Sequence, residues 1–197
     1  MRNISGIAIL FALLWPVTSC VSSVEPDIDL NTSAVEDQPY YSELTKATRE
    51  RTIFKDFETR YIMTATYLSP EFRAAFAGRL ERVYKRGEAG FQEATTKAGF
   101  FVTLNAPGGD DRIDLTNVHH WTVLLESKDG PLKPVLIKRI DDKVRWRPFF
   151  PGVTHWSSEY LVIFDTPSVD ANSAQMVAKT AIHLTLANAD AKVSLTW

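Results

Sequence analysis

The chain has 197 residues, of which 45% are hydrophobic and 23% are charged, and its formal net charge is -2. This balance is that of a globular protein, which excludes a disordered chain, and it lacks the basic excess of a nucleic-acid-binding protein. The single cysteine excludes a disulfide within the chain, so the folded state has to be stabilised by burial alone.

The first 20 residues have the three-part layout of a secretory signal. Arg2 supplies the positive region, and residues 4–15 form an apolar run that is too short to span a bilayer as a helix. Pro16 ends this run, and the only cysteine, Cys20, follows a short stretch of small residues. The segment 17–20 (VTSC) resembles the bacterial lipobox, at which the signal is cut immediately before the cysteine.

The resemblance to the lipobox implies that Cys20 is the first residue of a mature bacterial lipoprotein. Its thiol would carry a diacylglyceryl group and the new amino terminus would be acylated, which would anchor the protein stably in a membrane of the cell envelope. Val21 is not the aspartate that commonly retains lipoproteins at the inner membrane, which favours the outer membrane in a cell with two membranes. The alternatives are an ordinary secretory signal with a chance cysteine, or an uncleaved anchor.

Residues 21–39 are predicted to be a flexible tether. They carry five carboxylates, no lysine or arginine and no apolar period, so they cannot bury enough surface to offset the entropy of ordering. As a flexible coil this segment would reach roughly 25 Å; the alternative is that part of it pairs as an edge strand. The chain is thus divided into a signal (1–19), the lipidated cysteine with its tether (20–39) and one domain (40–197).

The first part of this domain, residues 40–98, is predicted to contain a long strand and an amphipathic helix. Residues 40–51 are ambiguous and compatible with a short helix. Residues 53–68 alternate in the manner of a strand, with these apolar residues on one parity: Phe57, Tyr61, Met63, Ala65 and Tyr67. A helix is predicted over residues 70–86, because Ser69 is a good N-cap and Pro70 suits the first helical position. Residues 88–98 could add a further turn or two of helix.

The predicted helix has two different faces. Its apolar face consists of Phe72, Ala75, Phe76, Leu80, Val83 and Tyr84. Its other side carries the cations Arg79, Arg82, Lys85 and Arg86. We expect this basic side to be solvated; the alternative is that it contacts a phosphate-bearing lipid or an acidic partner.

The second part of the domain, residues 99–197, is predicted to be rich in strands. Strand patterns occur at residues 100–105, 118–126, 134–140, 144–147, 160–165, 181–187 and 192–197, and Asp129-Gly130 is a hairpin signal. Seven short strands without room for crossover helices predict a mainly β fold, an antiparallel immunoglobulin-like β-sandwich with an N-terminal strand and amphipathic helix. The cysteine and tryptophan hallmark of immunoglobulin domains is absent, so the likeness concerns architecture only.

The sequence carries none of the readily identified catalytic or cofactor motifs, such as G-x-S-x-G, H-E-x-x-H or G-x-G-x-x-G, and no cofactor is predicted. His119 and His120 are disfavoured as a metal pair, because neighbours on a strand point to opposite faces. Asp110, Asp111 and Asp114 are a weak candidate for Ca²⁺, because they offer carboxylate ligands without the spacing of an EF-hand loop.

The most unusual segment is a proline-containing loop that carries several aromatic and arginine residues. Residues of these types are enriched at the centres of binding interfaces. The candidate binding patch consists of Arg145, Trp146, Arg147, Phe149, Phe150, His155 and Trp156. The alternative is structural: Phe149 and Trp156 would fold inward and cap the sandwich.

The first functional hypothesis is a non-catalytic envelope lipoprotein that binds or assembles with an envelope protein or polymer, and whose other partner is the membrane lipid around acylated Cys20. The second is a hydrolase of unrecognised type, which requires His119 and His155 to converge with the aspartates of the candidate calcium loop. The third is a carbohydrate-binding sandwich, which requires Trp146 and Trp156 to be coplanar and exposed.

Overall fold

The computed structural model describes residues 37–84, 96–107, 114–127, 130–167 and 181–197. These residues are mainly β, as predicted. In chain order the elements are α2 (Gln38–Ala47), β1 (Thr48–Lys55), β2 (Glu58–Tyr67), α3 (Pro70–Tyr84), β3 (Lys97–Asn105), β4 (Thr122–Ser127), β5 (Gly130–Leu132), β6 (Pro134–Ile140), α4 (Lys143–Trp146), β7 (Ser158–Pro167), β8 (His183–Ala187) and β9 (Lys192–Thr196). No helix in these ranges is long and apolar enough to cross a bilayer.

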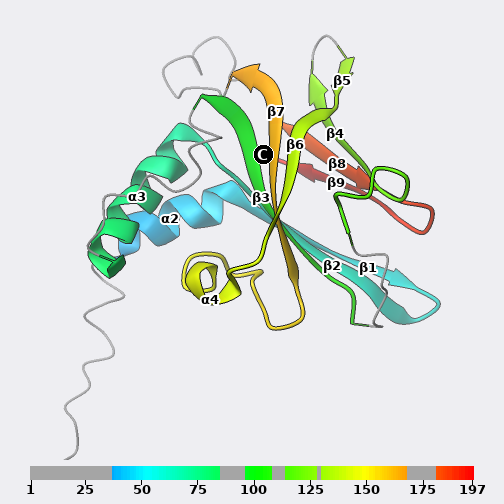
Figure 1. Cartoon of the computed structure of the whole chain (residues 1–197), viewed down its shortest axis with the longest axis horizontal. Helices are drawn as coiled ribbons and strands as arrows, with labels where there is room; N and C mark the ends of the chain where they lie inside the picture. The colour runs from blue at the N-terminus through cyan, green and yellow to red at the C-terminus, as the bar shows by residue number, and fades with distance from the viewer. Residues whose placement is uncertain (1–36, 85–95, 108–113, 128–129, 168–180) are drawn as a thin grey trace, which may run out of the picture.

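The elements form three layers (Figure 1). The middle layer is a five-stranded antiparallel sheet with the order β1-β2-β3-β7-β6. One of its faces packs against a four-stranded antiparallel sheet with the order β5-β4-β8-β9, and the other face is covered by the helices. The fold is therefore consistent with a β-sandwich, with helices added on the outer face of the larger sheet.

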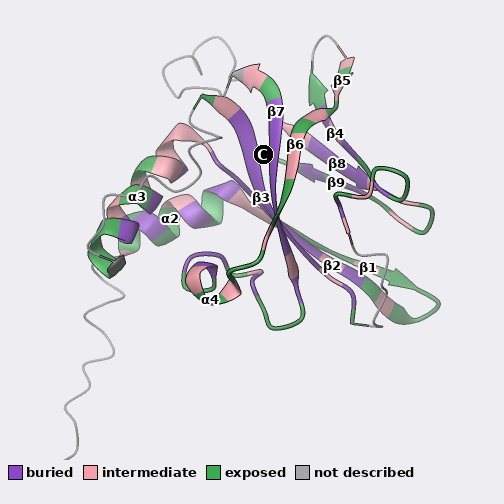
Figure 2. Ribbon diagram, in the orientation of Figure 1, coloured by how far each residue is buried: buried purple, intermediate pink, exposed green. Residues whose placement is uncertain are grey.

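Each face of the five-stranded sheet has its own hydrophobic core. The inner core lies between the two sheets, and the outer core lies under the helices and the segment around α4. Strand β3 contributes to both, since Phe100 belongs to the inner core and Phe101 to the outer core. Figure 2 shows the resulting continuous burial along β3 and β7. The dense apolar run in β7 is explained by this position, because a strand covered on both faces does not alternate.

The predicted long strand over residues 53–68 is instead a hairpin of β1 and β2. Asp56 and Phe57 turn the chain with φ angles of 54° and 65°, a combination typical of a two-residue hairpin turn. Tyr61 and Met63 lie on the buried parity as predicted, but Phe57 lies in the turn and is exposed. The turn contains no glycine or asparagine, so no strong hairpin signal marks it in the sequence.

The predicted helix is confirmed as α3, but one arginine on its predicted solvated face is buried. Ser69 caps it, because its Oγ accepts a hydrogen bond from the Phe72 amide at 3.1 Å. Phe72 and Leu80 are buried on the predicted apolar face. The prediction that Arg79 is solvated is wrong: its side chain is only 9% exposed and forms an ion pair with Asp37. Asp37 directly precedes α2, so a residue assigned to the tether is what holds Arg79 inside.

Two other predicted strands differ from the structure, whereas the strand predicted over 134–140 is confirmed as β6. The strand predicted over 118–126 begins only at β4, because residues 117–121 form a turn. The chain after Gly130 pairs with β4 as the short strand β5 and then crosses at Lys133 to the other sheet as β6. The strand predicted over 144–147 is the short helix α4, which is capped by the Asp142 side chain accepting from the Arg145 amide at 3.2 Å. Most of the helix suggested over 88–98 lies outside the described residues, and its last two residues belong to β3.

Candidate functional site

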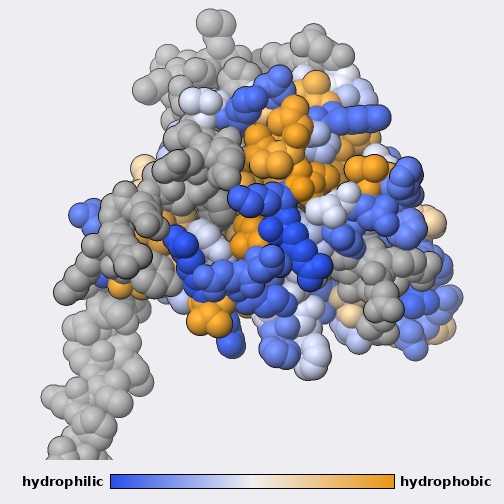
Figure 3. Space-filling view, viewed as in Figure 1, coloured by the Kyte–Doolittle hydropathy of each residue, from blue (hydrophilic) through white to orange (hydrophobic). Residues whose placement is uncertain are grey.

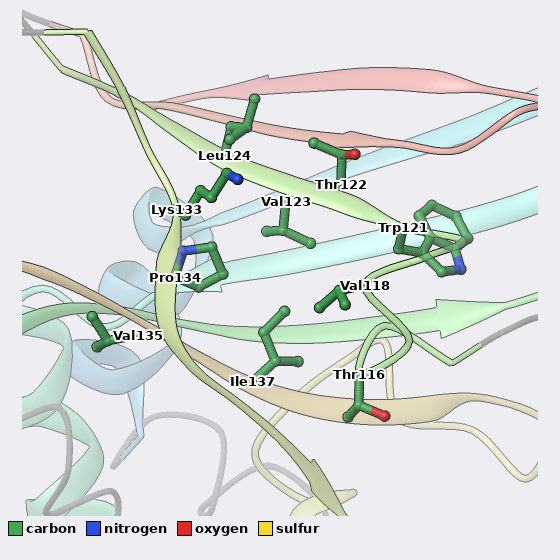
Figure 4. A pocket seen from close by; sticks show the side chains of 10 residues that line it. All are labelled: Thr116, Val118, Trp121, Thr122, Val123, Leu124, Lys133, Pro134, Val135 and Ile137. Atoms are coloured by element: carbon green, nitrogen blue, oxygen red, sulfur yellow. The ribbon is translucent and has the colours of Figure 1, made fainter.

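A groove of about 360 Å³ lies between β4 and β6, where the chain passes from one sheet to the other (Figure 4). It forms because β5 pairs with β4 only from Leu125 to Ser127, after which the chain leaves for the five-stranded sheet. The groove is lined by Thr116, Val118, Trp121, Thr122, Val123, Leu124, Lys133, Pro134, Val135 and Ile137.

Seven of the ten residues that line the groove are apolar, although polar and apolar atoms contribute about equally to the surface of its walls. Trp121 and Val123 are buried and belong to the inner core, so one side of the groove is continuous with the interior. Val118 and Val135 are 72% and 57% exposed. Figure 3 shows hydrophobic side chains gathered on the face over which Figure 1 draws β6. Exposed valines beside a groove offer apolar surface that the fold itself does not use.

The groove is also bordered by strand edges. In an antiparallel pair, successive residues direct their main-chain groups to opposite sides. Because two residues connect Ser127 to Gly130, these two residues form a hydrogen-bonded pair. The next hydrogen-bonded pair along the ladder is Leu125 with Leu132. By this alternation the N–H and C=O groups of Val123 point to the same side, into the groove. No described strand pairs with that side of Val123.

The opposite border is the outer edge of β6, which pairs with β7 on its other side. The register between β6 and β7 shifts between Pro134 and Leu136, so that Val135 is the extra residue of a bulge. This bulge explains why Val135 is exposed although it lies in a strand.

One charged residue lines the groove in the described part of the chain. Among the ten described lining residues, Lys133 is the one charged side chain and none is a carboxylate. Figure 4 shows the Lys133 side chain between the two strands, at the crossover. The groove can therefore hold apolar side chains and accept a single negative charge near this lysine.

A smaller cavity of about 160 Å³ shares Trp121 with the groove. It contains His119 and His120, which lie in a turn and not on the predicted strand, and both are exposed. Trp121 packs edge-on against Tyr61 at 5.5 Å, and Asn188 donates a hydrogen bond to the Tyr61 hydroxyl at 3.1 Å. This cavity extends the groove toward the turn between β8 and β9.

The predicted aromatic patch is divided between the core and the surface. Trp146, Phe149 and Phe150 are buried in the outer core, where Phe150 stacks on Phe101 at 3.9 Å. These three rings cover the sheet, as the structural alternative expected of Phe149.

The rest of the patch lies at the surface. Arg147, His155 and Trp156 are exposed, with the rings of His155 and Trp156 in edge contact at 4.7 Å. The Arg145 guanidinium lies 4.9 Å from the Trp146 ring. Because Trp146 is buried, it does not form an exposed pair with Trp156.

The candidate calcium loop is described only at Asp114. Its carboxylate accepts hydrogen bonds from the Thr116 amide at 3.0 Å and the Thr116 hydroxyl at 2.7 Å, and these lower the pKa of Asp114. Asp110, Asp111 and Cys20 lie outside the described residues. Within the described ranges no three His, Cys, Asp or Glu side chains are grouped so that they could hold a metal ion.

No pattern in the sequence predicts the groove. A groove between two sheets depends on strand pairings that join distant segments, and the sequence carries only one local signal beside it. Pro134 cannot donate to a strand ladder, and a proline inside an apolar run marks an edge strand or a break. The predicted strand over 134–140 does begin at this proline, but the three residues of β5 before it are too few to be predicted as a strand.

The chain matches no family model, no curated protein and no solved structure. What the groove can bind therefore has to be inferred from its own residues: seven apolar side chains, one lysine and two strand edges.

Proposed function

We propose that this chain is a non-catalytic binding module of the cell envelope, held at a membrane by acylated Cys20. Its two packed sheets act as an immunoglobulin-like sandwich that binds an extended polypeptide segment in the groove between β4 and β6. The observation that carries this proposal is the open edge of β4 beside a groove in which seven of the ten lining residues are apolar.

The mode of binding is strand addition. An extended segment that lies beside β4 exchanges main-chain hydrogen bonds with Val123, and such bonds supply affinity without regard to sequence. Alternate side chains of an extended segment point the same way, so every second residue enters the groove. There they contact Val118, Val135 and Ile137, which supply the apolar surface.

The chemistry of the groove also restricts the partner segment. Lys133, with no carboxylate among the described lining residues, favours a segment that alternates apolar residues with acidic ones. A basic segment would bring a like charge to Lys133, which disfavours it.

A display library of eight-residue peptides tests this proposal on the full chain. Half of the library alternates valine, isoleucine or leucine with aspartate or glutamate, and the other half has the same composition in scrambled order. We expect selection to enrich the alternating peptides. A selected peptide should lose most of its affinity when alternate backbone nitrogens are methylated, because methylation removes the donors that strand addition needs.

A matched pair of substitutions locates the binding site. Val135→Asp should weaken the selected peptide at least tenfold, on the order of the loss of one buried apolar side chain. Val144→Asp changes a valine that is 86% exposed on α4, outside the groove, and should leave affinity unchanged. Equal binding of scrambled or methylated peptides, or equal effects of the two substitutions, would refute the proposal.

A further inference from the structure

The tip of the β1–β2 hairpin carries two phenylalanines at the surface. Phe54 is 69% exposed, and Phe57, in the turn itself, is fully exposed. Neither ring appears in either hydrophobic core. The fold therefore gains little burial from Phe54 and none from Phe57.

The backbone conformation of Phe57 also gives the folded state no reason to have a phenylalanine at this position. Its φ angle of 65° lies in the left-handed region, where a residue with a Cβ atom is strained and glycine or asparagine is favoured. A phenylalanine here costs stability in the turn and recovers none by packing. Strained residues that the fold does not need are concentrated at functional positions.

The hairpin holds the two rings in a defined place. Strands β1 and β2 stay paired as far as Lys55 and Glu58, so the turn is the shortest possible connection. Lys55 Nζ also lies 2.7 Å from Asp190 Oδ1, which ties the hairpin to the turn between β8 and β9. The rings are thus presented on a braced protrusion.

The hairpin tip lies at the end of the molecule opposite to Asp37, where the described chain begins (Figure 1). Helix α2 and strand β1 follow one another across the molecule, and their lengths place the tip about 40 Å from Asp37. A contact made by Phe54 and Phe57 is therefore separate from whatever holds the N-terminal end.

We propose that Phe54 and Phe57 insert into a phospholipid surface and give the domain a second membrane contact, independent of the groove and of Cys20. A convex apolar tip fits a lipid layer, which needs depth of insertion and no complementary shape. Phenyl rings carry no hydrogen-bonding group, so they do not need the directional hydrogen bonds that a protein interface supplies.

The charges around the tip do not oppose a lipid surface. Arg51 and Arg60 flank the rings, against the two carboxylates of Asp56 and Glu58, and Lys55 is paired with Asp190. The tip is therefore close to neutral, and its apolar rings supply the attraction to lipid.

The test uses the full chain, purified from its own membrane and reconstituted into vesicles of phosphatidylethanolamine and phosphatidylglycerol. Glu58→Cys places an environment-sensitive fluorophore beside the tip and leaves both phenylalanines in place. We expect a blue-shifted emission that is quenched by lipids carrying a nitroxide near the top of the acyl chain. Val144→Cys, labelled in the same way, should report water.

The contact is then removed in the labelled Glu58→Cys chain. Phe54→Ser together with Phe57→Gly should return the emission to that of the protein in water, and each change alone should weaken insertion at least tenfold. Phe57→Gly should not lower the melting temperature, which separates loss of contact from loss of fold.

Several results would overturn the proposal. A label beside the tip that reports water in vesicles, or that is unaffected by the double substitution, contradicts insertion. A label that is shielded only when envelope proteins are added assigns the tip to a protein partner. Failure of anchoring is recognised separately, because mass spectrometry would then show an unmodified Cys20.

Discussion

Gly152 shows how the size of one residue fixes the segment that covers the five-stranded sheet. A Cβ atom at this position would lie 2.2 Å from Thr103 Oγ1 and 2.8 Å from Thr64 Cβ. Thr64 and Thr103 are paired neighbours on β2 and β3, so the obstacle is the sheet itself. Any side chain at residue 152 would lift the segment that brings Phe149 and Phe150 into the outer core.

Gly152→Ala should therefore lower the free energy of unfolding by about 1–3 kcal/mol, through overpacking against the two threonines. The control is Gly78→Ala in α3, where the nearest atom to the added Cβ is Arg82 Nη1 at an ordinary 3.7 Å. Replacing that helical glycine should raise the free energy of unfolding by about 0.5–1 kcal/mol. Urea midpoints measure both changes, and shifts of the same sign would contradict the argument.

Glu159 is a carboxyl group buried under the same segment. Ser157 Oγ donates a hydrogen bond of 2.5 Å to Glu159 Oε1, and Lys143 Nζ lies 4.0 Å from Oε2. Burial raises the pKa of Glu159 above its ordinary 4.5, while the Ser157 hydrogen bond and the positive charges of Lys143 and Arg139 partly oppose the shift. The folded state thus favours the protonated acid more than the unfolded chain does.

The contribution of Glu159 to stability should therefore be fully present below pH 4.5 and be lost as the pH rises through its raised folded pKa. Urea midpoints measured from pH 4 to pH 8 should fall less steeply in Glu159→Gln than in the unaltered chain. A pH dependence that is identical in both proteins would show that Glu159 does not titrate differently on folding.

At the scale of elements, α2 and α3 are joined by a buried charge. The Arg79 guanidinium pairs with Asp37 and lies 4.7 Å and 4.9 Å from the rings of Tyr40 and Tyr41. Arg82 also binds Asp37, at 2.9 Å, but its side chain is 47% exposed. Asp37 is thus the point at which both arginines hold the start of the described chain against α3.

Arg79→Ala should lower the free energy of unfolding by about 3 kcal/mol, since it removes one partner of a buried ion pair and leaves three rings without the cation they surround. Arg82→Ala, one turn further along the same helix, should cost less than about 1 kcal/mol because the pair is partly screened by water. Urea denaturation of the two variants measures the contrast. Equal costs would mean that Arg79 is not held as the structure places it.

The elements that the sequence predicted well are those whose pattern is local. Helix α3 was recognised from the spacing of Phe72, Phe76 and Leu80, and β7 from its dense apolar run. The burial of Arg79 was not predictable, because its partner Asp37 lies in an acidic segment that looked like tether. The turn at Asp56 and Phe57 was missed because it contains no glycine or asparagine and because Phe57 continues the apolar alternation of the strand.

The candidate site was less predictable than the fold. A sequence that contains Phe149 and Phe150 looks the same whether these rings contact a partner or pack in a core. Only the packing of α3 over the sheet shows that they are buried. The groove arises where the chain crosses at Lys133 from one sheet to the other. The periodicity of apolar residues within a strand does not indicate which sheet that strand joins.

At the scale of the whole molecule, the proposed anchor depends on the one cysteine of the chain. Cys20→Ala should yield a precursor that retains residues 1–19 and takes up no fatty acid, since the thiol that receives the diacylglyceryl group is gone. Metabolic labelling with a radioactive fatty acid, followed by measurement of the intact mass, tests this. Label on the variant equal to that on the unaltered chain would refute the assignment of the lipobox.

The placement of β3 and β7 also has a consequence for the motions of the protein. Both strands have a neighbour on each side and a packed layer on each face, and their pairing joins segments as distant as Gly99 and Ile163. No local opening can bring water to their amide groups, so these hydrogens should exchange with deuterium only when the entire domain unfolds. The β1–β2 hairpin, with one free edge, should exchange long before them. Because such distant segments have to meet before the central pair can form, the domain is expected to fold slowly.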